Sequence, residues 1–273
     1  MNCFTVNLPG TKATLNVNLR QSDYEFVEHH ARPFVLVIPG GGYCFLSEGE
    51  SEPIAMAFTT AGYQTAVLNY SVRPDDTLPY LGTTPLLEAA AAVRYIRDHA
   101  TEWGVDPQKI TVCGFSAGGH LTGSLGVFGA NEDYIPGASD GKCLPNAMIL
   151  GYPVITAGPA AHRDSFYHLT GHKEQGPEND RFSLELHVTD QTPPAFIWQP
   201  TTDDLVPVEN SFLMAEALKA HNIPFDLHLF QSGWHGIKLA NRETSCNDPL
   251  VSQWLEIALI WMNDTGVGPG YID

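Results

Sequence analysis

Positive charge is scarce in this sequence. Its 273 residues include 14 lysines and arginines against 31 aspartates and glutamates, which gives a formal net charge of −17. The few basic residues are scattered, and no basic patch or run is visible. Because such a chain is repelled by phosphate backbones and by anionic lipid headgroups, we expect no nucleic-acid partner and no membrane partner.

Long apolar runs are also missing. The longest are short segments such as residues 34–38, far below the stretch of about 18 apolar residues that a membrane helix requires. The first residues, from Met1 to Thr5, lack a basic start followed by an apolar stretch, so no secretory signal is predicted. The five cysteines are an odd number without a CxxC spacing, which indicates reduced thiols in a cytoplasmic protein.

The sequence does contain apolar material for a large core. Apolar residues make up 43% of the chain and no repeat is visible, so we expect a single α/β domain over residues 1–273. The stretch from Phe4 to Leu19 alternates loosely and predicts antiparallel edge strands. From Pro33 onward, apolar strands alternate with amphipathic helices, which is typical of a mostly parallel sheet flanked by helices. The expected strands cover 34–38, 65–69, 110–113, 147–150, 195–198 and 225–230, and the expected helices cover 52–61, 84–96, 116–127, 210–220 and 250–262.

Two segments depart from this alternation. Residues 156–192 are long, irregular and rich in histidine, glycine and polar residues, and a structureless loop of this length is uncommon unless it is functional. We interpret them as a small cap-like excursion over the top of the sheet that contributes to a substrate pocket. The tail from Asn263 contains three glycines and a proline, and we expect it to be loose.

The stretch from Gly114 to Gly118, Gly-Phe-Ser-Ala-Gly, is the strongest chemical signal. It matches G-x-S-x-G, with a short β-branched strand before it and a helix-compatible run after it. That context predicts a strained strand-to-helix turn that exposes the hydroxyl of Ser116, while the glycines permit close backbone contact. A helix that begins at Ser116 directs its free N–H groups toward a developing oxyanion. Ser116 is therefore the expected nucleophile.

A serine nucleophile needs a base, and the base needs an orienting acid. In hydrolases with this motif the acid and then the histidine follow the serine along the chain. His235 lies in a glycine-flanked turn just after the last expected strand, whereas His221 falls on a helix end and His228 within a strand. We therefore predict His235 as the base. The preceding loop offers two adjacent aspartates, Asp203 and Asp204, of which only one can orient the imidazole.

Three consecutive glycines, residues 40–42, follow the expected strand at 34–38. Glycines allow backbone N–H groups to point at a substrate without a Cβ in the way. This loop is therefore the expected source of the donors that stabilise an oxyanion.

The other histidines have simpler explanations. His120 lies two positions past Gly118 and is expected to point into the fold as a hydrogen-bonded structural histidine. His162, His168 and His172 include one pair at helical spacing, but no carboxylate or cysteine motif completes a metal site around them. Neither a metal ion nor an organic cofactor is predicted.

Together these features resemble the α/β-hydrolase superfamily. Within it, the chain is similar to the small bacterial esterases of the carbohydrate-esterase and acetyl-xylan-esterase-like group, which are relatives of the HGGG-type hormone-sensitive-lipase branch. The resemblance covers roughly residues 34–262 and implies a mostly parallel eight-stranded sheet flanked by helices. Its marks are the stretches Ile38-Pro-Gly-Gly-Gly-Tyr43, Asp106-Pro107, Gly114-Phe-Ser-Ala-Gly-Gly-His-Leu121, Phe182-Ser-Leu-Glu-Leu-His-Val188, Pro193-Pro194 and Asp203-Asp-Leu-Val-Pro-Val-Glu-Asn210.

Carried over by position, the resemblance implies Ser116 as the nucleophile and His235 as the base. The acid of the family lies four residues before the proline of a D-x-x-V-P turn, which implies Asp203. The implied oxyanion donors are the backbone N–H groups of Gly41, Gly42 and Ala117.

One position departs from the lipase branch. Pro39 stands where that branch has a histidine that supports the glycine loop by hydrogen bonding. A proline cannot make such a bond. Another residue must therefore hold the loop in this protein.

The implied activity is hydrolysis of short-acyl esters, often acetyl groups on sugars, so the expected partner is a small-molecule ester. An arylformamidase on the same fold stays open as an alternative. A peptidase of the prolyl-oligopeptidase type usually carries a propeller domain, for which this chain has no length. A non-catalytic binding protein is expected to lose triad members, whereas candidates for all three are present. A homodimer is the expected oligomeric state.

Overall fold

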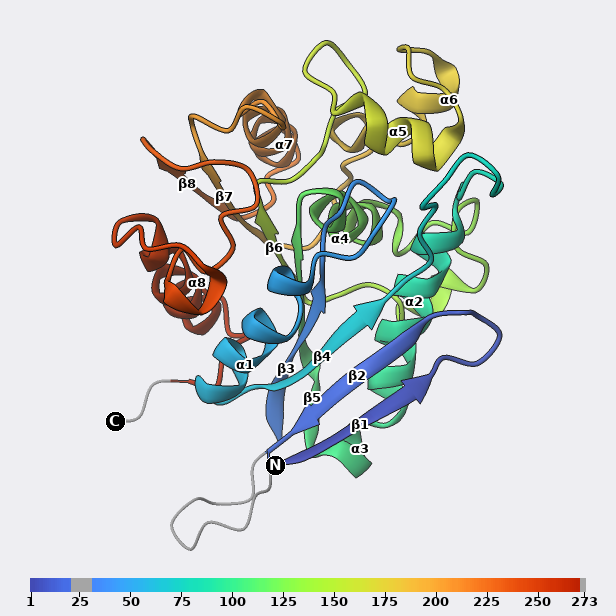
Figure 1. Cartoon of the computed structure of the whole chain (residues 1–273). Helices are drawn as coiled ribbons and strands as arrows, with labels where there is room; N and C mark the ends of the chain where they lie inside the picture. Colours follow the sequence, from blue (N-terminus) through green and yellow to red (C-terminus); the bar gives the residue numbers. More distant parts are fainter. Residues whose placement is uncertain (21–30, 271–273) are drawn as a thin grey trace, which may run out of the picture.

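A computed structural model describes residues 1–20 and 31–270, and its centre is an eight-stranded sheet (Figure 1). The strands are β1 Asn2–Asn7, β2 Thr14–Leu19, β3 Arg32–Ile38, β4 Gln64–Asn69, β5 Val105–Phe115, β6 Ala147–Gly151, β7 Ala195–Pro200 and β8 Phe225–Phe230. They follow the order β1-β2-β4-β3-β5-β6-β7-β8. β2 pairs antiparallel with β1 and β4, and the other neighbouring pairs are parallel. The predicted mostly parallel sheet with an antiparallel edge is confirmed.

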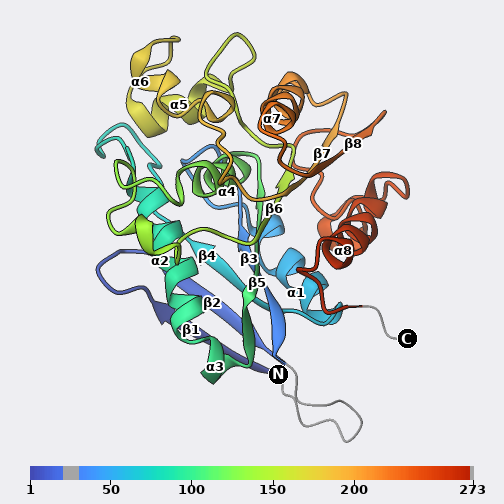
Figure 2. The ribbon, with the colours of Figure 1, turned by 180° about the vertical axis from the view of Figure 1, so that it is seen from behind.

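Helices cover both faces of this sheet, as the two opposite views show (Figures 1 and 2). The helices are α1 Glu52–Thr60, α2 Thr84–Asp98, α3 Ala100–Trp103, α4 Ala117–Phe128, α5 Arg163–Thr170, α6 Pro177–Asp180, α7 Glu209–Ala220 and α8 Trp254–Asp264. Buried side chains of α1 and α8 form one apolar cluster, and those of α2, α4 and α7 form a second. Within the described ranges, no helix is both long and apolar enough to cross a membrane.

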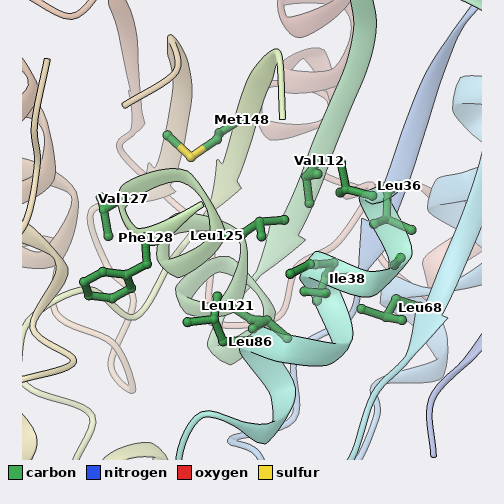
Figure 3. Packing of buried hydrophobic residues seen from close by; sticks show 14 of the residues in the cluster. Leu36, Ile38, Leu68, Leu86, Val112, Leu121, Leu125, Val127, Phe128 and Met148 are labelled. Atoms are coloured by element: carbon green, nitrogen blue, oxygen red, sulfur yellow. The ribbon is translucent and has the colours of Figure 1, made fainter. Parts of the chain in front are cut away.

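The central strand β3 shows how the sequence produces this layering. Val35 and Val37 belong to the cluster with α1 and α8, whereas Leu36 and Ile38 belong to the cluster with α2 and α4. Figure 3 shows part of the second cluster, where Leu36 and Ile38 lie near Leu86 of α2 and the leucines of α4. Because helices cover both faces, the buried positions 33–38 of this strand are all apolar and the usual alternation is absent.

Several element boundaries differ from the prediction. β5 begins at Val105, five residues before the expected strand, and continues to Phe115. α4 begins at Ala117 because Ser116 has a φ of 54°, which no residue of a right-handed helix adopts. α2 begins at Thr84 as expected but continues to Asp98, and α8 begins at Trp254 after a 3-10 turn.

Residues 156–192 are more regular than the sequence suggested. They contain α5, α6 and a 3-10 turn, and α5 and α6 lie beyond the ends of the central strands (Figure 1). Buried amide side chains replace regular backbone pairing here. Asn179 donates to the carbonyls of His172 and Glu174, and Asn210 accepts from the N–H groups of Ile155 and Thr156. The expectation of an irregular segment was therefore wrong for α5 and α6.

The tail from Asn263 is not loose as far as Gly270. α8 continues to Asp264, and the N–H of Val267 then donates to the carbonyl of Met262 at 2.9 Å. The side chain of Val267 is buried in the cluster of α1 and α8, and Lys109 donates to the carbonyl of Gly268 at 3.2 Å. The expectation of a loose tail was wrong for residues 263–270 because of these contacts, and residues 271–273 lie outside the described residues.

Candidate active site

Ser116 lies on a tight bend between β5 and α4. Its φ of 54° and ψ of −121° are strained for a residue with a Cβ, as the nucleophile-bearing turn of G-x-S-x-G requires. The two flanking glycines are sterically necessary. A Cβ on Gly114 would lie 2.2 Å from the carbonyl oxygen of Gly118, and one on Gly118 would lie 2.2 Å from the carbonyl oxygen of Ile38. The motif therefore brings the serine against the end of β3.

His235 joins this serine to an aspartate through both nitrogens of its ring. Its Nε2 lies 2.7 Å from Oγ of Ser116, and its Nδ1 lies 2.8 Å from Oδ2 of Asp203. When Nδ1–H donates to the carboxylate, Nε2 is left to accept the serine proton. The predicted serine, histidine and aspartate are thus brought together from the loops after β5, β8 and β7.

The carboxylate of Asp203 is fixed by its own loop. Its side chain is fully buried, and Oδ1 accepts from the N–H groups of Leu205 and Val206 at 3.0 and 2.9 Å. The amide of Gln199 approaches Oδ2 at 3.4 Å. Asp204 is exposed, so the structure distinguishes the two aspartates that the sequence left open.

The turn that carries His235 depends on glycine. Gly233 and Gly236 have φ values of 130° and 75°, which side chains with a Cβ rarely adopt. The two other histidines of this region lie elsewhere. His221 pairs with Asp190 on the surface, and the ring of His228 stacks on Phe196 at 4.8 Å.

His120 is a structural histidine, as predicted. It is 1% exposed, and its two ring nitrogens lie 2.8 Å from the hydroxyl of Tyr43 and 2.8 Å from the carbonyl of Phe182. Burial lowers the pKa of His120 to about 4. The ring therefore stays neutral, with one nitrogen donating and the other accepting.

The glycine loop lies directly beside the serine. A Cβ on Gly40 would lie 2.8 Å from Cβ of Ser116, and one on Gly41 would lie 2.1 Å from the carbonyl oxygen of Phe45. Gly41 and Gly42 have positive φ values of 123° and 60°. In the part of the chain that the structure describes, no acceptor meets the N–H groups of Gly41 and Gly42. These groups are free to receive an oxyanion.

The loop is held by residues that the sequence did not reveal. The hydroxyl of Tyr70 donates to the carbonyl of Pro39 at 2.8 Å. The N–H of Gly40 donates to Oε2 of Glu50 at 2.8 Å, and Nδ1 of His168 lies 2.8 Å from the carbonyl of Gly42. In the sequence, only the proline at position 39 indicated that other residues must support the loop. It did not indicate which residues these are.

The histidines of the segment 156–192 do not form a metal centre. Nδ1 of His162 lies 2.8 Å from Oγ of Ser165, while His168 contacts the glycine loop. Burial lowers the pKa of His162, and its electrostatic interaction with the neighbouring His235 lowers it further. Among residues 1–20 and 31–270, no group of three or more histidine, cysteine or acidic side chains could hold a metal ion.

The sequence of this chain is similar to those of several known proteins. The BD-FAE family model matches residues 25–218. Endo-1,4-beta-xylanase B of Butyrivibrio fibrisolvens is 44% identical over 213 residues, which are 78% of this chain and 33% of that protein. Acetylxylan esterase of Xylanibacter ruminicola is 29% identical over 74% of this chain and 40% of that protein. The chain therefore spans only about a third to two fifths of the length of these curated relatives.

A solved structure extends the likeness to almost the whole chain. The acetyl ester-xyloside bifunctional hydrolase of Caldicellulosiruptor lactoaceticus is 33% identical, with a TM-score of 0.81, and the match covers 95% of this chain and 90% of that one. Further similar structures include a protein described as an α/β hydrolase. This chain belongs to the BD-FAE family and has the α/β-hydrolase fold.

Proposed function

We propose that this protein is a serine carboxylesterase in which Ser116 is the nucleophile, His235 the general base and Asp203 the acid that orients it. One observation carries the proposal. A single imidazole makes hydrogen bonds of 2.7 Å to the serine hydroxyl and 2.8 Å to a buried carboxylate. A serine is a poor nucleophile without such a base, so this arrangement supplies the activation that ester cleavage needs.

The proposed reaction has two steps. Nε2 of His235 takes the proton of Ser116 while Oγ attacks the ester carbonyl and forms a tetrahedral intermediate. The protonated histidine then gives its proton to the leaving alcohol, and the acyl group stays on the serine. Water repeats the sequence on the acyl-enzyme, releasing the acid and the free serine. Asp203 keeps the imidazole in the required orientation and stabilises its protonated form.

Backbone N–H groups of Gly41, Gly42 and Ala117 are the proposed donors to the oxyanion. Ala117 is the first residue of α4, and the first N–H groups of a helix have no partner within it. The glycine loop lies against Ser116 on its other side. Each well-placed donor of this kind contributes about 2.7–4 kcal/mol to the stabilisation of the transition state.

Acetyl esters of sugars are the proposed substrates. Two similar proteins carry names of this kind, the acetylxylan esterase of Xylanibacter ruminicola and the acetyl ester-xyloside hydrolase of Caldicellulosiruptor lactoaceticus. The xylanase from Butyrivibrio fibrisolvens is a longer protein, of which this chain matches 33%. We assign esterase chemistry to this chain because its described site contains a serine with its base.

Steady-state kinetics on a panel of substrates tests this function. We expect turnover of acetylated xylo-oligosaccharides and of p-nitrophenyl acetate, with p-nitrophenyl octanoate a much poorer substrate. Ser116→Ala is the control for background hydrolysis. If kcat/KM for N-formylkynurenine exceeds that for every acetyl ester, the protein is an arylformamidase and the substrate proposal is wrong.

A further inference from the structure

Glu50 is a buried carboxylate that the proposed reaction does not use. It ends the 3-10 turn Glu48–Glu50 just before α1 and is 3% exposed. Carboxylates are seldom buried unless their oxygens have partners. Within the described residues no cationic side chain pairs with Glu50, and both of its oxygens instead accept hydrogen bonds from uncharged groups.

The first of these bonds reaches the glycine loop. Oε2 of Glu50 accepts from the N–H of Gly40 at 2.8 Å. Gly40 packs closely on the bend that carries Ser116. An added Cβ on Gly40 would lie 2.8 Å from both this oxygen and Cβ of Ser116. Glu50 therefore fixes the start of the loop at the point where it touches the serine.

The second bond reaches the loop that carries the histidine. Oε1 of Glu50 accepts from the hydroxyl of Tyr152 at 2.8 Å, and that hydroxyl accepts from the N–H of Lys238 at 3.2 Å. Lys238 is three residues after His235. The ring of Tyr152 also lies edge-to-face on the ring of His235, with their centroids 5.1 Å apart. Tyr152 thus contacts both the imidazole and the backbone beside it.

The backbone of Tyr152 is bent to make these contacts. Tyr152 directly follows β6 and has a positive φ of 35°, which is strained for a residue with a Cβ. Its N–H donates to the carbonyl of Trp198 at 2.7 Å, which anchors it to the end of β7. Burial, and after it the charge of Glu50, raises the pKa of Tyr152 well above its usual value, so the hydroxyl keeps the proton that it donates.

We propose that Glu50 and Tyr152 are positioning residues that hold the glycine loop and the histidine loop at a fixed separation around Ser116. The proposal rests on the esterase function proposed above. Acyl transfer needs the serine oxygen, the imidazole and the oxyanion donors in place at the same moment, and a misplacement of about 1 Å can cost about 100-fold in rate. The path from Gly40 through Glu50 and Tyr152 to Lys238 links the two loops across the core.

Tyr152→Phe tests this path because it keeps the ring beside His235 and removes only the hydroxyl. We expect kcat for p-nitrophenyl acetate to fall about tenfold while KM stays within about twofold, since the defect concerns the arrangement in the transition state. Affinity for phenylboronic acid, which forms a tetrahedral adduct with an active serine, should fall in parallel with kcat.

Glu50→Gln changes the same path from the other end, because its amide nitrogen can only donate to the hydroxyl of Tyr152, which donates to Glu50 in the wild type. The glutamine keeps the volume and one oxygen for the N–H of Gly40, so its loss of kcat should not exceed that of Tyr152→Phe. Because both substitutions act on one path, the double variant should lose no more than the worse single variant. Full additivity of the two losses would overturn the proposal.

Tyr63→Phe is the matched control. Tyr63 is buried in the apolar cluster that also contains Tyr152. Among the described residues, the hydroxyl of Tyr63 has no hydrogen-bond partner. Its loss should leave kcat unchanged. An active wild type with unchanged kcat in folded Tyr152→Phe and Glu50→Gln would overturn the positioning role alone. A wild type that turns over no ester would overturn the proposed function together with it.

Discussion

The two sides of the site are built in different ways. On one side, three side chains from the loops after β5, β7 and β8 bond directly to one another, with His235 in the middle. On the other side, the glycine loop offers only backbone groups and is held from outside by Tyr70, Glu50 and His168. The first side needs particular functional groups, whereas the second needs only donors and acceptors in the correct places.

This difference predicts two kinds of response to substitution. Changes on the side of the triad should remove chemistry and leave the fold intact. Changes on the side of the glycine loop should alter geometry, with effects that depend on the space and the backbone angles at each position. The substitutions below test this distinction.

Ser116→Ala has the largest expected effect. Without the nucleophile, kcat for p-nitrophenyl acetate should fall by at least about 10⁴-fold, because the proposed acyl-enzyme cannot form. The melting temperature should change little, since the substitution removes one oxygen from a surface of the site. A variant that retains a tenth of the activity would show that another group attacks the ester.

Asp203→Asn and Asp204→Asn form a matched pair. Asparagine at 203 can donate to Nδ1 and hold the wrong tautomer of His235, so kcat should fall by about 10³–10⁴-fold. Asp204 is exposed, and its substitution should leave kcat within about twofold. A greater loss in the second variant than in the first would reverse the assignment of the acid.

Gly41→Ala and Gly42→Ala compare two positions of the glycine loop. A Cβ on Gly41 would lie 2.1 Å from the carbonyl oxygen of Phe45, so the loop must move. Displacing a donor should lower kcat by about 10²–10³-fold. A Cβ on Gly42 would lie 3.8 Å from its nearest neighbour, Cε1 of His162, and φ is 60° there. The loss of kcat in Gly42→Ala should therefore be at most about tenfold. Equal rates in both variants would argue against loop geometry as the cause.

His120 has the smallest expected effect on kcat, because its expected effect concerns stability alone. Burial lowers its pKa to about 4, while an unfolded histidine has a pKa of about 6.5. Between these values the unfolded chain binds a proton that the folded one does not, so stability falls as the pH falls from 6.5 to 4, by about 3 kcal/mol. Unfolding by urea at pH 7 and pH 4.5 measures this loss, and His120→Gln should reduce it. An unchanged pH dependence in that variant would contradict the assignment.

The residues that the sequence proposed for the side of the triad lie together in the structure, and sequence patterns could select them because the proposed chemistry restricts residue types. G-x-S-x-G fixes the bend by steric necessity, and the order of serine, acid and histidine selects late loops. The choice between Asp203 and Asp204 needed either the resemblance or the structure, because neighbouring residues in a turn differ only in direction.

The supports of the glycine loop could not be predicted in the same way. Glu50, Tyr70 and Tyr152 are distant in sequence from the loop or from one another, and each makes a bond that several residue types could make. The same holds for the segment 156–192, where buried asparagines stabilise turns that no periodic pattern marks. Tertiary contacts determine the conformation of both regions. Patterns in a single sequence report only local preferences, so they could not predict these contacts.

Covalent labelling measures the central claim most directly. The protein is treated with a p-nitrophenyl organophosphate, followed by intact-mass measurement and peptide mapping, beside His235→Ala and Ser116→Ala. The account predicts one adduct on Ser116 of the wild type, formed in proportion to the loss of esterase activity, and far slower labelling in both variants. An active wild type that carries its adduct on another residue, or labels equally fast without His235, would contradict it.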